Sequence, residues 1–209
     1  MNQQLAVTPT PTELKLVLAG LGGQGVIFTV CLLARTAVAL GHSVMLSEIH
    51  GMSQRGGSVI SHLRIGGSEA PLIRRGTADL LLALEPDEAL RNLPFLRRGG
   101  VVFVNTEDGL RPEVAEHLER LEIQVLSLPA THMALELGSA AVTNVVLVGF
   151  AAAYPFLPLP IDALRETLAV IAPRGRELNL QALEAGYCAG RRAAGAERAV
   201  PGSQTFGAG

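Results

Sequence analysis

Cysteine is scarce in this sequence of 209 residues, which contains only Cys31 and Cys188. An iron–sulfur cluster normally takes four thiolate ligands, so two separated thiols exclude such a cluster from this chain. Both cysteines lie within patterns typical of helices, where we interpret them as small hydrophobic side chains. The histidines lack the spacing of metal ligands, and we predict no metal site.

Other absences narrow the class of protein. With 17% charged residues and a net charge of -2, the chain lacks the basic footprint of a nucleic-acid-binding protein. No basic start followed by an apolar run marks a secretory signal. The apolar stretch at residues 143–159 contains Asn144, Tyr154 and two prolines and falls short of a bilayer span. We therefore expect a cytoplasmic protein with neither nucleic-acid nor membrane partners.

Aromatic residues make up 4% of the chain, with no Trp, whereas 48% of residues are hydrophobic. The core must therefore be aliphatic, which suits a parallel sheet covered by helices. The apolar surplus is larger than a small monomer needs, and large exposed apolar patches usually mark partner surfaces. We expect an obligate interface with another polypeptide.

The order of elements follows from apolar runs and glycine positions. Strands are predicted at residues 14–19, 44–47, 58–65, 80–84, 101–104 and 125–128, and helices at 26–40, 86–95 and 112–121. This alternation predicts an α/β fold, with a Rossmann-like, doubly wound and mainly parallel sheet. Residues 133–137, 144–154, 161–171 and 180–191 predict a helical C-terminal portion. We expect a flexible segment at 1–13, one domain at 14–192, and a flexible or partner-bound tail at 193–209.

Gly20, Gly22 and Gly25 have the spacing of a dinucleotide-binding turn and lie between a predicted strand and helix. They would allow a tight turn, close approach of a ligand, and close packing of helix on strand. Glu48 is a poor match for the usual ribose-binding acid. The candidate residues for contact with an anion or with a partner are Gly20, Gly22, Gly23, Gln24 and Gly25. An equally weighted alternative is a close strand-to-helix crossing that needs no ligand.

A second motif, at residues 47–59, concentrates ionisable, amide and hydroxyl side chains among three glycines after the second strand. Ligands of open α/β sheets bind at this end of the strands. We therefore take His50, Gln54 and Arg55 as candidate active-site residues. Arg55 is suited to bidentate binding of a carboxylate or phosphate, or else to a buried salt bridge with Glu48.

The motifs Gly20-Leu21-Gly22-Gly23-Gln24-Gly25 and His50-Gly51-Met52-Ser53-Gln54-Arg55-Gly56-Gly57, with residues 61–65, resemble the gamma-type domain of 2-oxoacid:ferredoxin oxidoreductases. The resemblance covers roughly residues 14–188 and is strongest to the indolepyruvate branch. It implies a small subunit whose large partner carries thiamine diphosphate, Mg²⁺ and iron–sulfur clusters. It also implies oxidative decarboxylation of a 2-oxoacid, indolepyruvate or another arylpyruvate, with coenzyme A as co-substrate and ferredoxin as acceptor. His50, Gln54 and Arg55 would then lie near the partner's active-site entrance.

Two other interpretations stay open at this point: a stand-alone nucleotide- or flavin-binding protein, and a purely structural subunit. Individual polar residues also have simple structural interpretations. Asn144 and Asn179 each precede an apolar helical stretch, where asparagine most simply caps the helix or satisfies nearby backbone groups. His62 and Arg64 share one strand face, and we interpret His62 as a satisfied structural residue.

Overall fold

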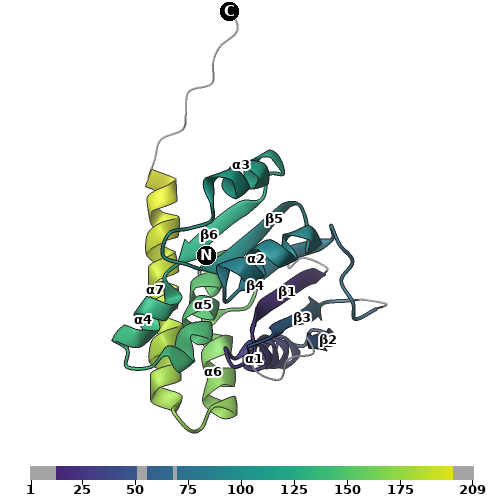
Figure 1. Cartoon of the computed structure of the whole chain (residues 1–209). Coiled ribbons are helices and arrows are strands. Elements are labelled where there is room, and N and C mark those ends of the chain that lie inside the picture. The colour runs from purple at the N-terminus through teal and green to yellow at the C-terminus, as the bar shows by residue number, and fades with distance from the viewer. Residues whose placement is uncertain (1–12, 51–55, 68–69, 200–209) are drawn as a thin grey trace, which may run out of the picture.

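A computed structural model describes residues 13–50, 56–67 and 70–199, and shows a twisted sheet with helices on both faces (Figure 1). Within this part of the chain the sheet has six strands in the order β2-β3-β1-β4-β5-β6. Their bounds are β1 (Leu14–Leu21), β2 (Val44–His50), β3 (Ser58–Ile65), β4 (Ala78–Ala83), β5 (Leu96–Asn105) and β6 (Gln124–Leu128). The predicted α/β class is confirmed, and every predicted strand is present.

Most of the sheet is parallel, and β3 is the exception. β1, β4, β5 and β6 pair in parallel, whereas β3 pairs antiparallel with β1 on one side and β2 on the other. Parallel neighbours need a crossover of a dozen or more residues, and only residues 51–57 join β2 to β3. This short connection makes the chain turn straight back, so β3 runs antiparallel beside β2, and its other edge pairs with β1.

Alternation along the strands divides the core into two layers. Leu16 and Leu18 of β1 pack under α1 (Val26–Ala39), α5 (Thr143–Ala152) and α6 (Ile161–Ile171). Val17 and Ala19 face α2 (Pro86–Asn92), η1 (Leu93–Phe95) and α3 (Pro112–Arg120). Because both faces are covered, the parallel strands read as continuous apolar runs in the sequence.

The C-terminal portion is helical, as predicted, with α4 (Ala130–Glu136), η2 (Ala140–Val142), α5, α6 and α7 (Arg176–Ala199). The last helix is the long one at the side of the sheet in Figure 1. It runs past the predicted end at residue 191, because residues 193–199 are rich in alanine, the strongest helix former. Among the described residues, no helix combines the length and hydropathy needed to cross a bilayer. The cytoplasmic location stays a prediction.

Helices α5 and α7 touch through their backbones. A Cβ atom built on Gly149 would lie 2.0 Å from the Leu183 carbonyl oxygen, and one on Gly186 would lie 1.9 Å from the Val146 oxygen. No side chain fits at either position, so glycine is required there for the close approach. Because α7 packs this closely on α5, it helps to fix the position of the first turn of α5. That turn contributes to the candidate site.

Candidate functional site

The glycine turn joins β1 to α1 at the carboxyl edge of the sheet. A Cβ on Gly20 would lie 2.9 Å from the Val26 side chain, and one on Gly25 would lie 2.6 Å from the Asn144 amide nitrogen. Gly25 is also the N-cap of α1 and has a φ of 81°, a conformation that favours glycine. The close-crossing interpretation therefore accounts for Gly20 and Gly25 through packing alone.

The turn is also tied to the second motif. The Gly22 amide donates to the Gly57 carbonyl oxygen at 2.9 Å, just before β3 begins. Gly23 has a φ of 100° and is exposed, with open space around its Cα. The two motifs that stand out in the sequence therefore meet at one edge of the sheet, although about thirty residues separate them.

Gln24 closes the turn with both ends of its amide group. Its Oε1 accepts from the Leu21 amide at 2.8 Å, and its Nε2 donates to the Glu85 carboxylate. Gln24 is thus a positioning residue within the turn, and it brings a carboxylate to the glycines. Glu85 was not predicted as a site residue, although its position two residues after the end of β4, at the ligand-binding edge, is a signal that could have found it.

A second carboxylate, which is buried, fixes the start of β3. Glu88 in α2 is fully buried, accepts a hydrogen bond from the Ser58 hydroxyl at 2.6 Å, and forms an ion pair with Arg91. A buried charge without partners is costly, so these contacts hold α2 against the end of the second motif. In the sequence, the acidic residues at the start of α2 indicate only a favourable helix N-terminus. They do not predict the contact between Glu88 and Ser58.

Two cavities open beside the glycine turn. The smaller, of about 360 Å³, is lined by Gly23, Gln24, Leu84, Glu85, Thr131, Ala140, Ala141 and Thr143. It lies at the carboxyl ends of β1 and β4, from which the chain leaves in opposite directions, and open α/β sheets bind ligands at such a switch point. The carboxylate of Glu85 makes this cavity unfavourable for an anion.

The larger cavity, of about 740 Å³, shares Gly23 with the smaller one and extends over the start of α1. Its lining also includes Gly25, Phe28, Asn144, Arg174 and Asn179. The N-terminal ends of α1, α5 and α7 all contribute to it, and helix N-termini carry free amides and partial positive charge. Together with the guanidinium of Arg174, these groups make the larger cavity the one suited to an anion.

Asn144 links the helical portion to the glycine turn. Its Nδ2 donates to the Gly25 carbonyl oxygen at 3.3 Å and to the Thr29 hydroxyl at 3.0 Å, while that hydroxyl donates to Gly25 at 2.9 Å. The predicted capping role is wrong, because Val142 is the N-cap of α5. The alternative, satisfaction of nearby backbone groups, is what the structure shows. Asn179 behaves likewise, since its Nδ2 donates to Gly175 at 3.0 Å.

The candidate residues of the second motif are only partly placed. His50 is the last residue of β2, where its backbone pairs with Val59, but its side chain lies outside the described residues. Gln54 and Arg55 also lie outside them. The roles of all three, and the alternative ion pair of Arg55 with Glu48, stay predictions.

His62 is a structural residue, as the sequence predicts, but it is only partly satisfied, because its buried Nε2 has no hydrogen-bond partner among the described residues. It is 1% exposed, its Nδ1 accepts from the Ile73 amide at 2.9 Å, and its ring meets Phe95 edge-on. Burial lowers the pKa of the His62 imidazole below its ordinary value. The neutral ring, which can accept at Nδ1, is therefore the form that holds the loop before β4.

The donor atoms for a metal or cluster are not gathered in the described part of the chain. Cys31 lies on α1 and Cys188 on α7, both half-buried, and no group of three His, Cys, Asp or Glu side chains is placed to hold a metal ion. The described residues therefore do not fit an iron–sulfur cluster or a magnesium diphosphate site.

The outer side of α1 is apolar. Ile27, Cys31, Ala34 and Val38 recur at helical spacing on one stripe, and Ile27 and Val38 are 46% and 59% exposed. Leu46, on the neighbouring edge strand β2, is also exposed. The surface beside the glycine turn thus has the apolar character expected of a partner interface.

The sequence matches the pyruvate ferredoxin/flavodoxin oxidoreductase family over residues 15–189. It is 39% identical to the indolepyruvate oxidoreductase subunit IorB of Archaeoglobus fulgidus, covering 84% of this chain and 94% of that one. It is 34% identical to the same subunit of Thermococcus kodakarensis, covering 88% of this chain and 98% of that one.

Solved structures show the same fold. A keto/oxoacid ferredoxin oxidoreductase gamma subunit from Geobacter sulfurreducens superposes with a TM-score of 0.64 at 24% identity, covering 85% of this chain and 98% of that one. A 2-oxoglutarate:ferredoxin oxidoreductase from Magnetococcus marinus, solved with 2-oxoglutarate, coenzyme A and succinyl-CoA, gives a TM-score of 0.73 at 19% identity. That match covers 88% of this chain and 32% of the longer one.

Proposed function

Because the chain belongs to the pyruvate ferredoxin/flavodoxin oxidoreductase family and is the small subunit of a 2-oxoacid:ferredoxin oxidoreductase, we propose that its complex acts on indolepyruvate or another arylpyruvate. The observation that carries this is similarity to indolepyruvate oxidoreductase subunits along nearly their whole length. The alternative of a stand-alone nucleotide- or flavin-binding protein is wrong, since these relatives are subunits of oxidoreductases.

The reactive groups belong on the larger partner in this proposal. Thiamine diphosphate, Mg²⁺ and the iron–sulfur clusters supply the decarboxylation chemistry and the electron path to ferredoxin. The described residues of this chain offer no matching set of donors. What the chain contributes is therefore binding and orientation at the edge where the glycine turn and the second motif meet.

We assign the anionic part of coenzyme A to the larger cavity. The start of α1 and the Arg174 guanidinium provide positive charge there, whereas Glu85 disfavours an anion in the smaller cavity. Asn144 acts as a positioning residue, because it holds the Gly25 carbonyl and so fixes the first turn of α1. His50, Gln54 and Arg55 follow the neighbouring strand and are proposed to face the 2-oxoacid.

The apolar stripe of Ile27, Cys31, Ala34 and Val38 is proposed to dock on the large subunit. It begins at the glycine turn, so docking there would place the candidate site at the interface. Only one charged residue, Arg35, lies on α1. A helix that is apolar nearly all round is typical of one buried on both sides.

The first experiment measures ferredoxin reduction by the coexpressed complex with a panel of 2-oxoacids. We expect indolepyruvate or phenylpyruvate to give the highest kcat/KM. A preference of more than about tenfold for pyruvate or 2-oxoglutarate, which is about 1.4 kcal/mol, would contradict the substrate assignment. A large subunit that is fully active without this chain would contradict its part in the active site.

The second experiment tests the coenzyme A contact. Arg174→Ala is expected to raise the KM for coenzyme A roughly tenfold, because it removes a charge-assisted contact to a phosphate. Arg176→Ala is the matched control, since Arg176 is also exposed but does not line the cavity. Equal KM values in the two variants would rule out the assignment.

Docking is tested separately. Val38→Arg should abolish copurification with the large subunit, while Leu135→Arg on α4, which is 58% exposed, should not. The two variants add the same charge at equally exposed positions. Loss of the complex in both, or in neither, would show that the α1 stripe is not the interface.

A further inference from the structure

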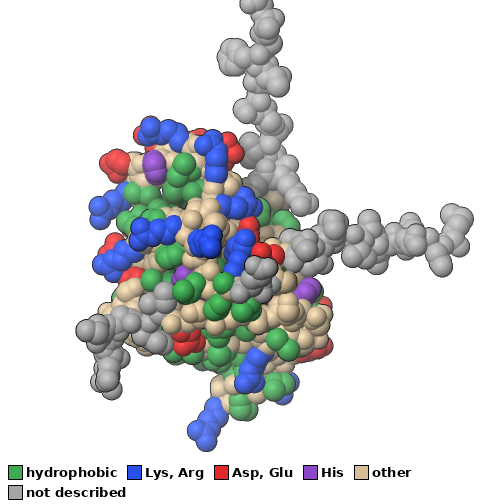
Figure 2. Space-filling view, turned by 90° about the vertical axis from the view of Figure 1, so that its right-hand side faces the viewer, with side chains coloured by type: hydrophobic (Ala, Val, Ile, Leu, Met, Phe, Trp, Pro, Cys, Tyr) green, Lys and Arg blue, Asp and Glu red, His purple; other side chains and the backbone are tan. Residues whose placement is uncertain are grey.

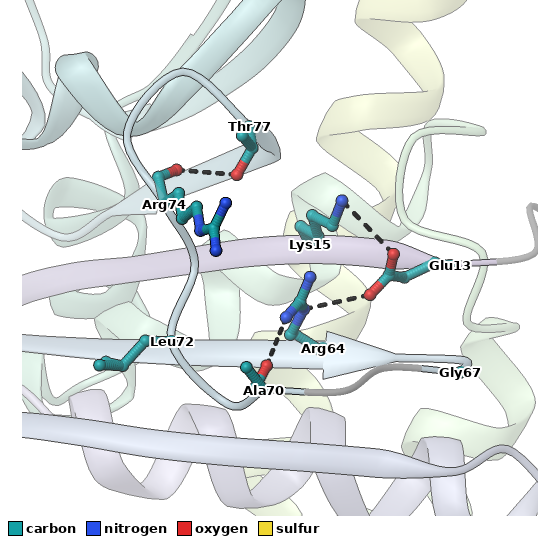
Figure 3. A pocket seen from close by; sticks show the side chains of 8 residues that line it. All are labelled: Glu13, Lys15, Arg64, Gly67, Ala70, Leu72, Arg74 and Thr77. Carbon is teal, nitrogen blue, oxygen red and sulfur yellow. Dashed lines mark hydrogen bonds and ion pairs between the residues drawn. The ribbon is translucent and has the colours of Figure 1, made fainter.

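A third cavity lies at the opposite end of the sheet from the glycine turn (Figure 3). It has a volume of about 630 Å³ and is lined by Glu13, Lys15, Arg64, Gly67, Ala70, Leu72, Arg74 and Thr77. Lys15 is near the start of β1 and Gly22 follows its end, so the eight-residue strand separates the two regions by roughly 25 Å. The glycine turn and its cavities therefore account for none of these residues.

Three cationic side chains from three segments meet in this cavity: Lys15 from β1, Arg64 from β3, and Arg74 from the loop before β4. Figure 3 shows the Arg74 guanidinium turned toward the heads of Lys15 and Arg64. The one acidic lining residue, Glu13, lies 3.4 Å from the Lys15 ammonium and 3.1 Å from the Arg64 guanidinium. Among the lining side chains, two positive charges remain in excess.

The backbone that carries Arg74 is held in place. The Thr77 hydroxyl donates to the Arg74 carbonyl at 2.8 Å, and the Gly76 and Thr77 amides donate to Pro94 and Phe95 at 2.9 and 3.0 Å. On the other side, the amide of Ile73 donates to buried His62. The loop therefore keeps Arg74 beside two other cations, an arrangement that repulsion alone would not favour.

Arg64 is fixed as well. Its guanidinium pairs with Glu13 and donates to the Ala70 carbonyl oxygen, so it ties the loop to β1 and β3. Arg74, in contrast, has no ion pair among the described residues. The Arg74 side chain is exposed, while its backbone is anchored beside Lys15 and Arg64. A cation that is anchored through its backbone and not neutralised is available to an oxyanion ligand.

Other cationic residues lie near the cavity. Arg75 adjoins Arg74, and Arg97 and Arg98 begin β5 at the same end of the sheet. Lys and Arg side chains gather across the upper half of the face shown in Figure 2. Arg97 and Arg98 are paired with Asp79 and Glu122, so the local excess of positive charge is centred on the cavity.

We propose that this cavity binds a small dianionic oxyanion, a phosphate monoester or a dicarboxylate, between Arg74, Lys15 and Arg64. Two negative charges would neutralise the excess of the lining. Exposed Leu72 gives one apolar wall for the carbon skeleton of such a ligand. The ligand would bridge the loop to β1 and β3 and so stabilise this end of the sheet.

The test is equilibrium dialysis of the complex of this chain with its large subunit, with radiolabelled inorganic phosphate as the probe. Thiamine diphosphate, Mg²⁺ and coenzyme A are kept saturating, so that sites for these groups are filled. One saturable phosphate site per small subunit is expected. Competition by unlabelled succinate then distinguishes the two ligand classes, since strong displacement favours a dicarboxylate and weak displacement a phosphate monoester.

Variants locate the site. Arg74→Gln should weaken phosphate binding roughly tenfold or more, and Arg74→Lys should retain part of it. Arg75→Gln is the matched control, because it removes the same charge one residue outside the lining and should change affinity by less than about twofold at physiological salt. Lys15→Gln, on β1, should weaken binding independently of the loop.

Two results would overturn the proposal: no saturable phosphate or succinate binding, or equal loss in Arg74→Gln and Arg75→Gln. The outcome is separable from the proposed function, because Arg74→Gln should leave the KM for coenzyme A unchanged, whereas Arg174→Ala should leave phosphate binding unchanged.

Discussion

Gly186 offers the sharpest test of how the helical portion supports the site. A methyl group there would lie 1.9 Å from the Val146 carbonyl oxygen, 2.8 Å from its carbon and 2.9 Å from the Phe150 amide nitrogen. All three atoms are backbone, so no side chain can rotate away. Gly186→Ala must instead push α7 away from α5 by roughly an ångström, opening the packing along their whole contact.

The magnitude follows from two opposing effects. Alanine favours the helical state by about 1 kcal/mol relative to glycine, whereas overpacking a rigid contact costs about 1–3 kcal/mol and sometimes more. The contact at Gly186 is at the severe end, because the clash is with backbone. We expect a net loss of about 2 kcal/mol, which lowers Tm by roughly 4–8 °C in a protein of this size.

Gly195 supplies the matched control within the same helix. It lies on α7, and no atom comes within 4 Å of the place that an alanine methyl group would occupy, so Gly195→Ala gains helix propensity without a clash. We expect a Tm raised by roughly 2 °C. Thermal and urea unfolding of both variants, coexpressed with the large subunit, measure the difference. A Gly186→Ala protein as stable as the Gly195→Ala protein would refute the packing argument.

Three further predictions concern single polar contacts. Burial lowers the pKa of His62, so near this pKa the unfolded chain binds more protons than the folded one. The free energy of unfolding should therefore fall as the pH drops below the ordinary value of 6.5. The urea midpoint measures this dependence on pH, and His62→Gln should flatten it. Gln24→Glu should lower Tm, since its carboxylate would then meet that of Glu85, and adding Glu85→Gln should restore Tm. A double-mutant cycle that shows no coupling would contradict the contact between Gln24 and Glu85. Asn144→Ala should cost about 1–2 kcal/mol of unfolding free energy in urea titrations, because it removes two hydrogen bonds to α1; an unchanged midpoint would argue against them.

The sequence predicts the elements well where one local pattern decides them. α1 begins at Val26, directly after Gly25, because glycine can adopt the left-handed N-cap conformation and a long run rich in Ala and Leu follows. The strand of residues 58–65 is found at those bounds, since its alternation reflects one side facing α1 and the other the loop before β4. The mainly parallel expectation leaves unspecified both the order of the strands and the antiparallel direction of β3.

The contacts that shape the site depend on residues far apart in the chain. Gln24 meets Glu85 across 61 residues, and Asn144 meets Gly25 across 119. Periodicity describes which side of an element is buried, and it carries no information on which distant polar group lies opposite. The rule that ligands bind at the carboxyl edge also directs attention away from Arg64 and Arg74, which lie at the other end.

The glycine turn itself shows why its spacing alone is a weak guide to function. In a dinucleotide-binding turn the amides remain available to the pyrophosphate. In this chain the Leu21 amide is bound by Gln24, the Gly22 amide by Gly57, and the Gln24 amide by Leu21. Two of these amides therefore close the turn on itself and the third holds it against the second motif, so none of the three is available to an anion. The same three glycines thus preserve the Rossmann geometry, and the bond from Gly22 to Gly57 fixes the turn beside the start of β3.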